Sequence, residues 1–403
     1  MNQHTDVLHD PAHAFMPYPK VPVPHAPTGP LAGLSFGVKD LFHVAGYPTS
    51  GGQPLLLALL GVQDRTAPTV QALLAAGARF AGKTITDELA FSMNGQNAHF
   101  GSPVNGAAPD RISGGSSSGS ASAVSNRLCD FALGTDTGGS VRAPASHCGL
   151  VGLRPTHGRV SLRDCLDLSP SFDTCGWFAR DVATFARVAE VLLDADALVL
   201  PKKLRVLAPT ELWALALPAA QDALQPVRQR VEDILGHATP VTLALGGVDV
   251  PYWHYRHLQG YEAWQVDGGF IRRFAPPLGP GVAQRFAWCA EVTDTQVAQA
   301  RSFREEFRAR FTDLLGDDGI LLLLPTMPDI APLCSEPEQA LDDYRQRAIR
   351  LLCNAGLTGL PQLSLPLARR AGAPLGLSLI GPAGSDRSLI GVAERIGAAW
   401  QDS

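Results

Sequence analysis

The sequence predicts an α/β fold, in which helices and strands alternate along one chain. Residues 66–77 have the apolar spacing and the early proline of a capped helix. Residues 78–82, directly after this helix, are typical of a strand. Two further apolar segments, 129–134 and 319–325, have the length of buried strands. Helix–strand units of this kind build sheets that are covered by helices.

The first third of the chain holds four further predicted segments. Residues 1–30 are rich in proline and are expected to form an arm that lies over the surface with little regular structure. Residues 34–40 alternate and end in charge, which predicts a strand that delivers Lys39 to its end. A short helix is expected over 87–94. Residues 119–128 have small side chains and predict a helix that packs closely against its neighbours.

The rest of the chain continues the alternation. Helices are expected over 181–193, over 211–236 with a break at Pro218, over 340–352 and over 387–400. Strands are expected over 204–208, 363–366 and 375–381. Residues 251–290 concentrate aromatic side chains, and long helices are expected to follow to residue 315. We find no internal repeat and no separating linker, so one domain is expected over residues 31–403.

Composition and charge exclude several classes of protein. Hydrophobic residues make up 45% of the 403 residues and the net charge is −5, which favours a large core and gives no reason to expect nucleic acid as a partner. The seven cysteines include no Cys-x-x-Cys pair, so neither a disulfide framework nor a metal site is expected. No signal peptide or membrane span is expected, because residues 1–11 are polar and the longest apolar segments, 55–60 and 320–324, are short. A cytoplasmic location is therefore expected.

Two loops rich in glycine and serine, residues 113–120 and 134–144, carry the predicted chemistry. Glycine allows backbone N–H groups to approach a bound group closely, and serine hydroxyls can attack, relay protons or donate hydrogen bonds. The loop 134–144 begins at the end of the predicted strand 129–134, where α/β sheets place their sites. We therefore expect a nucleophile, a proton relay and an oxyanion hole in these loops.

Three simpler interpretations of the loops fit less well. A phosphate-binding loop is disfavoured because Ser120 stands where that motif needs a lysine. Gly115-Ser-Ser117-Ser-Gly119 matches the Gly-x-Ser-x-Gly nucleophile elbow, but the preceding residues 109–113 do not form an apolar strand. A flexible linker is disfavoured because a predicted helix and strand separate the two loops.

Three motifs resemble those of the amidase signature family. They are Gly37-Val-Lys39-Asp40, Gly114-Gly-Ser116-Ser-Ser-Gly-Ser120 and Gly134-Thr-Asp-Thr-Gly-Gly-Ser140-Val-Arg142-Ala-Pro144. The spacing of 24 residues between Ser116 and Ser140 is the one that this family uses. The resemblance covers about residues 31–195 and 319–400, and the middle third does not match clearly. It implies one large twisted mixed β-sheet flanked by α-helices on both faces.

The resemblance also implies roles for individual residues. Ser140 would be the nucleophile, Ser116 a bridging serine held by a cis peptide bond, and Lys39 the base. A lysine acts as a base only when neutral, so Lys39 must be buried enough to lower its pKa. The backbone N–H groups implied for the oxyanion hole are those of Thr137, Gly138, Gly139 and Ser140. The residues expected to support the loops are Ser117 and the ion pair of Asp136 with Arg142.

The implied activity is hydrolysis of the C–N bond of a small amide through an acyl-enzyme, with no cofactor. The loop 114–120 and the segments 91–100 and 171–180 look similar to plant-type indole-3-acetamide hydrolases, which favours an aryl or aliphatic primary amide and makes Met93 a candidate for the acyl pocket. Residues 31–200 would hold the catalytic motifs, 201–318 a variable helical substrate region, and 319–403 the C-terminal strands and helix. Two alternatives remain open: the glutamine-hydrolysing subunit of a tRNA amidotransferase complex, and a catalytically inert binding protein. A homodimer is also left open.

Overall fold

One mixed sheet of ten strands runs through the computed structural model, which describes residues 10–243, 246–316 and 318–401. The strand order is β2-β1-β3-β5-β4-β9-β10-β8-β6-β7. The strands are β1 (Ser35–Lys39), β2 (Arg79–Thr84), β3 (Phe131–Thr135), β4 (Val151–Arg154), β5 (Cys175–Ala179), β6 (Arg205–Pro209), β7 (Ala238–Val241), β8 (Ile320–Pro325), β9 (Gln362–Arg370) and β10 (Ala373–Ile380).

Parallel pairing occupies the two ends of the sheet and antiparallel pairing its centre. At one end β1 lies parallel to both β2 and β3, and at the other end β6 lies parallel to β7 and β8. Between them β5, β4, β9 and β10 pair antiparallel. The expectation of one large mixed sheet is therefore confirmed.

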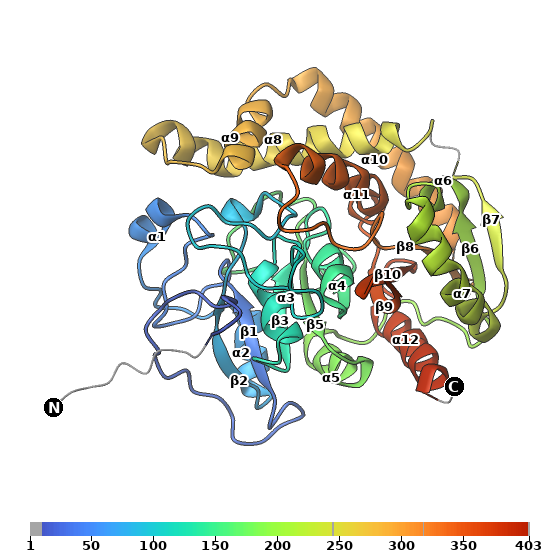
Figure 1. Cartoon of the computed structure of the whole chain (residues 1–403), viewed down its shortest axis with the longest axis horizontal. Helices are drawn as coiled ribbons and strands as arrows, with labels where there is room; N and C mark the ends of the chain where they lie inside the picture. The colour runs from blue at the N-terminus through green and yellow to red at the C-terminus, as the bar shows by residue number, and fades with distance from the viewer. Residues whose placement is uncertain (1–9, 244–245, 317, 402–403) are drawn as a thin grey trace.

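Helices cover both faces of the sheet, as expected (Figure 1). The α-helices are α1 (Pro54–Leu60), α2 (Pro68–Ala75), α3 (Ser118–Ser125), α4 (Arg142–Cys148), α5 (Val182–Leu192), α6 (Thr210–Trp213), α7 (Pro218–Leu235), α8 (Asp249–Phe274), α9 (Pro280–Cys289), α10 (Asp294–Leu315), α11 (Glu338–Thr358) and α12 (Asp386–Gln401). Helices α2, α5, α7 and α12 pack in one apolar cluster, and α3 and α4 pack on the opposite face. Successive strand residues alternate between these faces: Phe131 and Leu133 belong to the first cluster and Ala132 to the second.

The middle of the chain forms a layer of long helices beside the sheet. Helices α8, α9 and α10 follow one another, α8 contacts both α9 and α10, and α11 packs against both α8 and α10 (Figure 1). The aromatic residues of this stretch help to form the layer, because Tyr252, Tyr255 and Phe286 are almost fully buried. None of the helices in the described part of the chain combines the length and the apolar character needed to cross a membrane.

Two local expectations are corrected by the structure, and three strands were not predicted. The helix expected over 87–94 is only the 3₁₀ turn η1 (Glu88–Ala90), because Leu89 and Ala90 adopt positive φ angles that no α-helix accepts. The arm does not simply lie over the surface: residues 12 and 14–16 are buried, and Met16 N–H donates to Lys83 O on β2 at 2.8 Å. Strands β4, β5 and β7 were not predicted. The first nine residues of the arm lie outside the described part.

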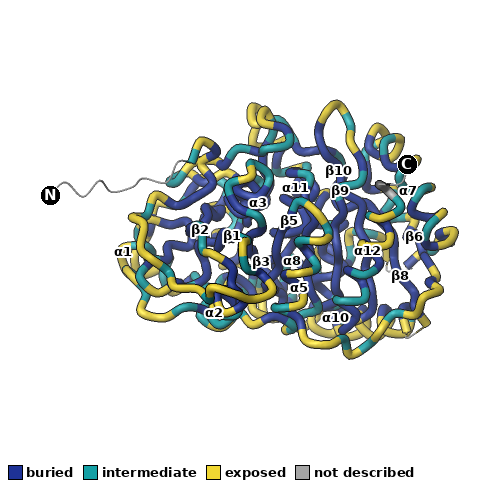
Figure 2. The backbone as a smooth tube through the Cα atoms, turned by 90° about the horizontal axis from the view of Figure 1, so that it is seen from below, coloured by how far each residue is buried: buried dark blue, intermediate teal, exposed yellow. Residues whose placement is uncertain are grey.

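The small side chains of α3 allow this helix to pack closely against neighbouring backbone segments. The helix is buried, as Figure 2 shows. A Cβ atom on Gly119 would clash with Ala14 O and with Ile85 N, and both are backbone atoms. This geometry explains why a glycine occupies the first turn of a helix that the sequence predicted to pack closely.

We expect Gly119→Ala to lower the free energy of unfolding by roughly 1–3 kcal/mol or more, because two backbone segments would have to move apart. Urea denaturation followed by circular dichroism measures the effect. The matched control is Gly269→Ala on α8, where an added Cβ meets nothing within 4 Å. This control should change stability by less than about 1 kcal/mol, in the stabilising direction. Equal stability of the two variants would contradict the close packing of α3.

Candidate active site

Lys39 is the last residue of strand β1, and it lies in the interior of the protein. Its side chain is fully buried, and its Nζ atom lies 2.8 Å from both Ser116 Oγ and Thr135 Oγ1. Burial lowers the pKa of Lys39 to about 8, and the nearby carboxylates, Asp87 first among them, oppose part of that shift. Since β1 and β3 are parallel neighbours, Lys39 and Thr135 reach the same edge of the sheet.

The loop before α3 places Ser116 against this lysine. The peptide bond between Gly115 and Ser116 is cis, and Gly115 N–H donates to Met93 O at 2.8 Å. Ser117 ties the loop to the end of β3, because its hydroxyl donates to Thr135 O and accepts from Thr135 N–H, each at 3.2 Å. Ser117 therefore supports the loop through β3 and makes no hydrogen bond with the lysine among the described residues.

The loop between β3 and α4 is held by a buried carboxylate. Asp136 and Arg142 are both inaccessible to solvent and form two hydrogen bonds, of 2.9 Å from Arg142 Nε and 2.7 Å from Arg142 Nη2. Arg154 Nη1 adds a contact of 3.3 Å to the same carboxylate. Burial alone would raise the pKa of Asp136, but the guanidinium groups of Arg142 and Arg154 hold it well below its usual range. The expected contact of Asp136 with Arg142 is thus present, as a buried pair.

Ser140 lies at the tip of this loop and is 5% exposed. Its carbonyl oxygen accepts from Ser117 N–H at 3.3 Å, which joins the two glycine- and serine-rich loops. In the described part of the chain, the Ser140 hydroxyl forms no hydrogen bond, with Ser116 or with any other group. The structure therefore brings Lys39 and Ser116 into contact and leaves the Ser140 hydroxyl free.

One of the four donors expected for the oxyanion hole is already used. Gly139 N–H donates to Asp136 Oδ1 at 2.9 Å, which corrects the expectation for Gly139. Within the described residues, the N–H groups of Thr137, Gly138 and Ser140 donate no hydrogen bond. These three groups remain available to a bound oxygen atom.

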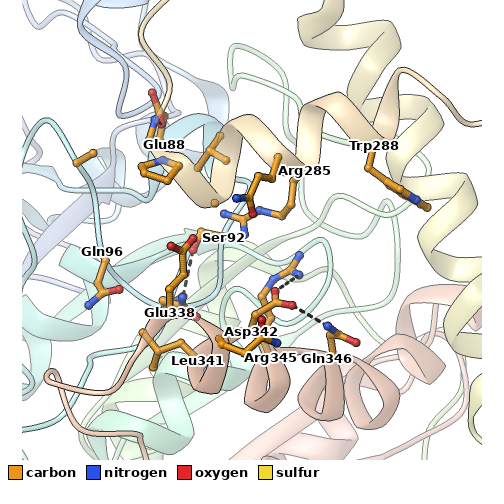
Figure 3. A pocket seen from close by; sticks show the side chains of 18 of the residues that line it. Glu88, Ser92, Gln96, Arg285, Trp288, Glu338, Leu341, Asp342, Arg345 and Gln346 are labelled. Atoms are coloured by element: carbon orange, nitrogen blue, oxygen red, sulfur yellow. Dashed lines mark hydrogen bonds and ion pairs between the residues drawn. The ribbon is translucent and has the colours of Figure 1, made fainter.

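A small cavity lies beside Ser140, and a larger cleft adjoins it. The cavity is lined by Ala90, Phe91, Ser92, Met93, Thr137, Gly138, Ser140, Leu168, Tyr255, Gln259, Arg345 and Ile349. The cleft has a volume of about 980 Å³ and lies between the loop after η1, helices α8 and α9, and the start of α11 (Figure 3). Ser92 and Arg345 line both spaces, so they mark the junction. Met93, the predicted pocket residue, does line the cavity that holds Ser140.

Sequence reasoning missed three residues that shape the site. Thr135 binds the lysine amine, and its place at the end of a predicted strand was the available signal. Asp87 is fully buried near Lys39, accepts from Gly95 N–H at 3.0 Å, and has its pKa raised by burial. Arg154 contacts the Asp136 carboxylate from β4. These contacts join segments far apart in the chain, so spacing alone did not indicate them.

The histidines near the motifs are engaged elsewhere. His147 Nε2 lies 2.9 Å from the Tyr344 hydroxyl, and burial lowers the pKa of His147 to about 3, so its ring stays neutral. His99 Nε2 lies 2.8 Å from Glu88 Oε1. Among the described residues, no group of three histidine, cysteine or acidic side chains is arranged to hold a metal ion.

The fold and the site define an α/β protein of the hydrolase type found in the amidase signature family, with a buried lysine–serine contact beside a glycine-rich loop. The amidase family model matches residues 18–211 and 272–390. The chain therefore belongs to the amidase family, as the sequence motifs predicted.

Individual relatives agree with this assignment. A protein of Arabidopsis thaliana named Amidase 1 is 38% identical over 91% of this chain and 93% of its own length. A rice protein of the same name is 36% identical over 95% of this chain and 94% of its own length. A crystal structure of an amidase superposes with a TM-score of 0.81 at 30% identity, covering 93% of this chain and 85% of that one.

Proposed function

We propose that this protein hydrolyses the C–N bond of a small primary amide through a Ser140 acyl-enzyme. The observation that carries the proposal is the buried contact between Lys39 Nζ and Ser116 Oγ, placed where the Ser140 loop crosses the Ser116 loop. A serine hydroxyl is a weak nucleophile and needs an adjacent base. A buried lysine with a lowered pKa supplies that base near neutral pH.

Acylation requires two linked proton transfers. Neutral Lys39 takes the proton of Ser116 while Ser116 takes that of Ser140, and Ser140 Oγ forms a bond to the amide carbonyl carbon. Ser116 then returns a proton to the leaving nitrogen, and the C–N bond breaks to release ammonia. Water later adds to the ester, gives its proton to the same relay, and displaces Ser140 as the alcohol. The net products are a carboxylic acid and ammonia.

The negative charge that develops on the carbonyl oxygen needs donors that are in place beforehand. We assign this role to the N–H groups of Thr137, Gly138 and Ser140, which have no other acceptor in the described part of the chain. Each preorganised donor of this kind lowers the barrier by roughly 3 kcal/mol. The Asp136–Arg142 pair holds the loop that presents them.

Substrate selection is assigned to the helical layer. We propose a single domain over residues 31–403 in which residues 31–200 carry the catalytic groups, the described parts of 201–318 contact the substrate, and 319–403 complete the sheet. Tyr255 and Gln259 of α8, together with Met93, line the cavity beside Ser140 and support this division.

The pH dependence of kcat/KM follows from the protonation state of Lys39. Because only neutral Lys39 accepts a proton, kcat/KM should rise tenfold per pH unit below the pKa of Lys39, about 8, and level off above it. An ammonia-release assay between pH 6 and 10 measures this profile. A profile that is flat from pH 6 to 9 would contradict the assignment of Lys39 as the base.

The proposed function is tested by labelling and by turnover. A fluorophosphonate should form a covalent adduct at Ser140, found by peptide mass spectrometry, and should block ammonia release from a library of primary amides. An adduct without turnover of any amide would support a partner-dependent enzyme, such as one component of an amidotransferase, if further proteins copurify. Absence of both adduct and turnover would support an inert binding protein and overturn the proposal.

A further inference from the structure

A buried arginine without hydrogen-bond partners stands at the junction of the cavity and the cleft. Arg345 lies on α11 and is 5% exposed. Among the described residues its guanidinium forms no hydrogen bond, and its Nε atom is fully enclosed. Its one ion-pair contact is with Asp342, at 3.6 Å, and this carboxylate already accepts a hydrogen bond from Gln346 at 2.6 Å (Figure 3).

The surroundings of Arg345 leave its positive charge poorly compensated. Burial and, to a smaller extent, the guanidinium groups of Arg285 and Arg256 lower the pKa of Arg345 to about 9. Those two arginines have partners of their own: Arg285 Nε donates to Phe91 O at 2.7 Å, and Arg256 Nη1 donates to the Tyr252 hydroxyl at 3.1 Å. A buried guanidinium with unused donors is costly unless an acceptor binds to it.

Arg345 is also the one charged side chain among the described residues that line the cavity beside Ser140. The acidic residues Glu88, Glu336, Glu338 and Asp342 line the outer cleft and not this cavity. The rest of the cavity wall is mixed: Phe91, Met93, Leu168 and Ile349 are apolar, and Ser92, Thr137, Ser140, Tyr255 and Gln259 are polar. The cavity has a volume of only about 20 Å³, so a short occupant would place its amide group there and an anionic end at Arg345, where the cleft adjoins it.

Two neutral polar side chains of α8 line the same cavity. The Tyr255 hydroxyl is buried and forms no hydrogen bond in the described structure. Burial raises the pKa of Tyr255 far above its usual range, so the hydroxyl remains a donor. Gln259 lies one turn further along α8 and lines the cavity as well. These groups supply further hydrogen bonds to a polar substrate.

We propose that the substrate is a short-chain primary amide that carries a carboxylate, and that Arg345 binds this carboxylate while Ser140 attacks the amide. This inference rests on the proposed function and specifies its substrate class. Arginine suits the task because its planar group binds a carboxylate through two parallel hydrogen bonds. A neutral aryl acetamide would leave the guanidinium without an acceptor.

The test compares matched pairs of amides in an ammonia-release assay. The monoamides of malonic, succinic and glutaric acid are each compared with a neutral amide of similar length, and phenylacetamide serves as the aryl arm. We expect wild type to show a kcat/KM at least tenfold higher for one carboxylated amide than for its neutral counterpart. Arg345→Gln should lower kcat/KM for that carboxylated amide by roughly 30-fold or more, mainly through KM. The preference over the neutral amide should disappear.

Two further variants separate binding from folding. Arg347→Gln, an exposed position on the same helix, should keep the wild-type preference. Arg345→Lys keeps the charge but not the planar group, so it should recover part of the preference. In wild type, the dicarboxylate product should inhibit competitively, which tests the site even if Arg345→Gln does not fold.

The outcomes separate a failure of this inference from a failure of the proposed amidase function. Turnover of neutral amides with no preference for carboxylated ones, or equal losses for both classes in Arg345→Gln, would overturn the inference and leave the amidase proposal intact. Absence of turnover together with absence of a Ser140 adduct would overturn both.

Discussion

Ser140→Ala and Lys39→Met should each lower kcat/KM by roughly 10⁴-fold or more, measured as ammonia release from the best amide substrate. The first variant removes the attacking atom. The second removes the only group placed to take a proton from Ser116 among the described residues, since Lys39 Nζ lies 2.8 Å from that hydroxyl. Because the residues act as one unit, the double variant should be about as slow as either single one.

The comparison needs variants that change the same residue types away from the site. Ser125→Ala, at the far end of α3, and Lys20→Met, on the exposed part of the arm, should retain wild-type activity. Near- and far-ultraviolet circular dichroism should show that all variants fold. Lys39→Met activity within tenfold of wild type would mean that another group serves as the base.

Arg142→Met should lower the free energy of unfolding by roughly 3–5 kcal/mol, because it leaves the buried Asp136 carboxylate with only the longer contact to Arg154 as its ion pair. Besides the two bonds to Asp136, Arg142 Nη1 donates to Leu352 O at 2.8 Å and contacts Gln362. The substitution therefore also removes donors that join the loop between β3 and α4 to α11 and β9. Urea denaturation measures the loss of stability.

A double-mutant cycle identifies the pair as the cause. Asp136→Asn combined with Arg142→Met should destabilise by less than the sum of the single changes, since the second change no longer strands a charge. The control is Arg65→Met, whose side chain is 73% exposed beside Asp64, and its effect should stay within about 0.5 kcal/mol. If Arg142→Met costs no more than this control, the buried pair does not stabilise the loop.

Local patterns predicted the framework of the site well. The alternation that ends at Lys39 identified β1, and the apolar segment before the glycine-rich loop identified the region of β3, although β3 ends one residue later than expected. Local signals succeeded here because each strand is buried on both faces and is followed at once by loop residues. The family motifs then indicated which loop side chains to expect together.

Other features of the site depend on contacts between distant segments. The sequence interpretation assigned every N–H group of residues 137–140 to the oxyanion hole. Only the fold shows that the Gly139 N–H group donates to Asp136 instead. Arg345 sits in a predicted helix, but its burial without partners results from the packing of α11 against α8. No spacing within either helix contains that information.

The placement of the helical layer has a consequence for how such a protein can change. Helices α8, α9 and α10 form one continuous excursion between β7 and β8, which lie at the end of the sheet remote from β1 and β3. Residues in this excursion can be exchanged without altering the strands that carry Lys39 and Thr135. Since Tyr255 and Gln259 of the cavity beside Ser140 come from this excursion, part of the cavity wall can vary while those strands stay the same.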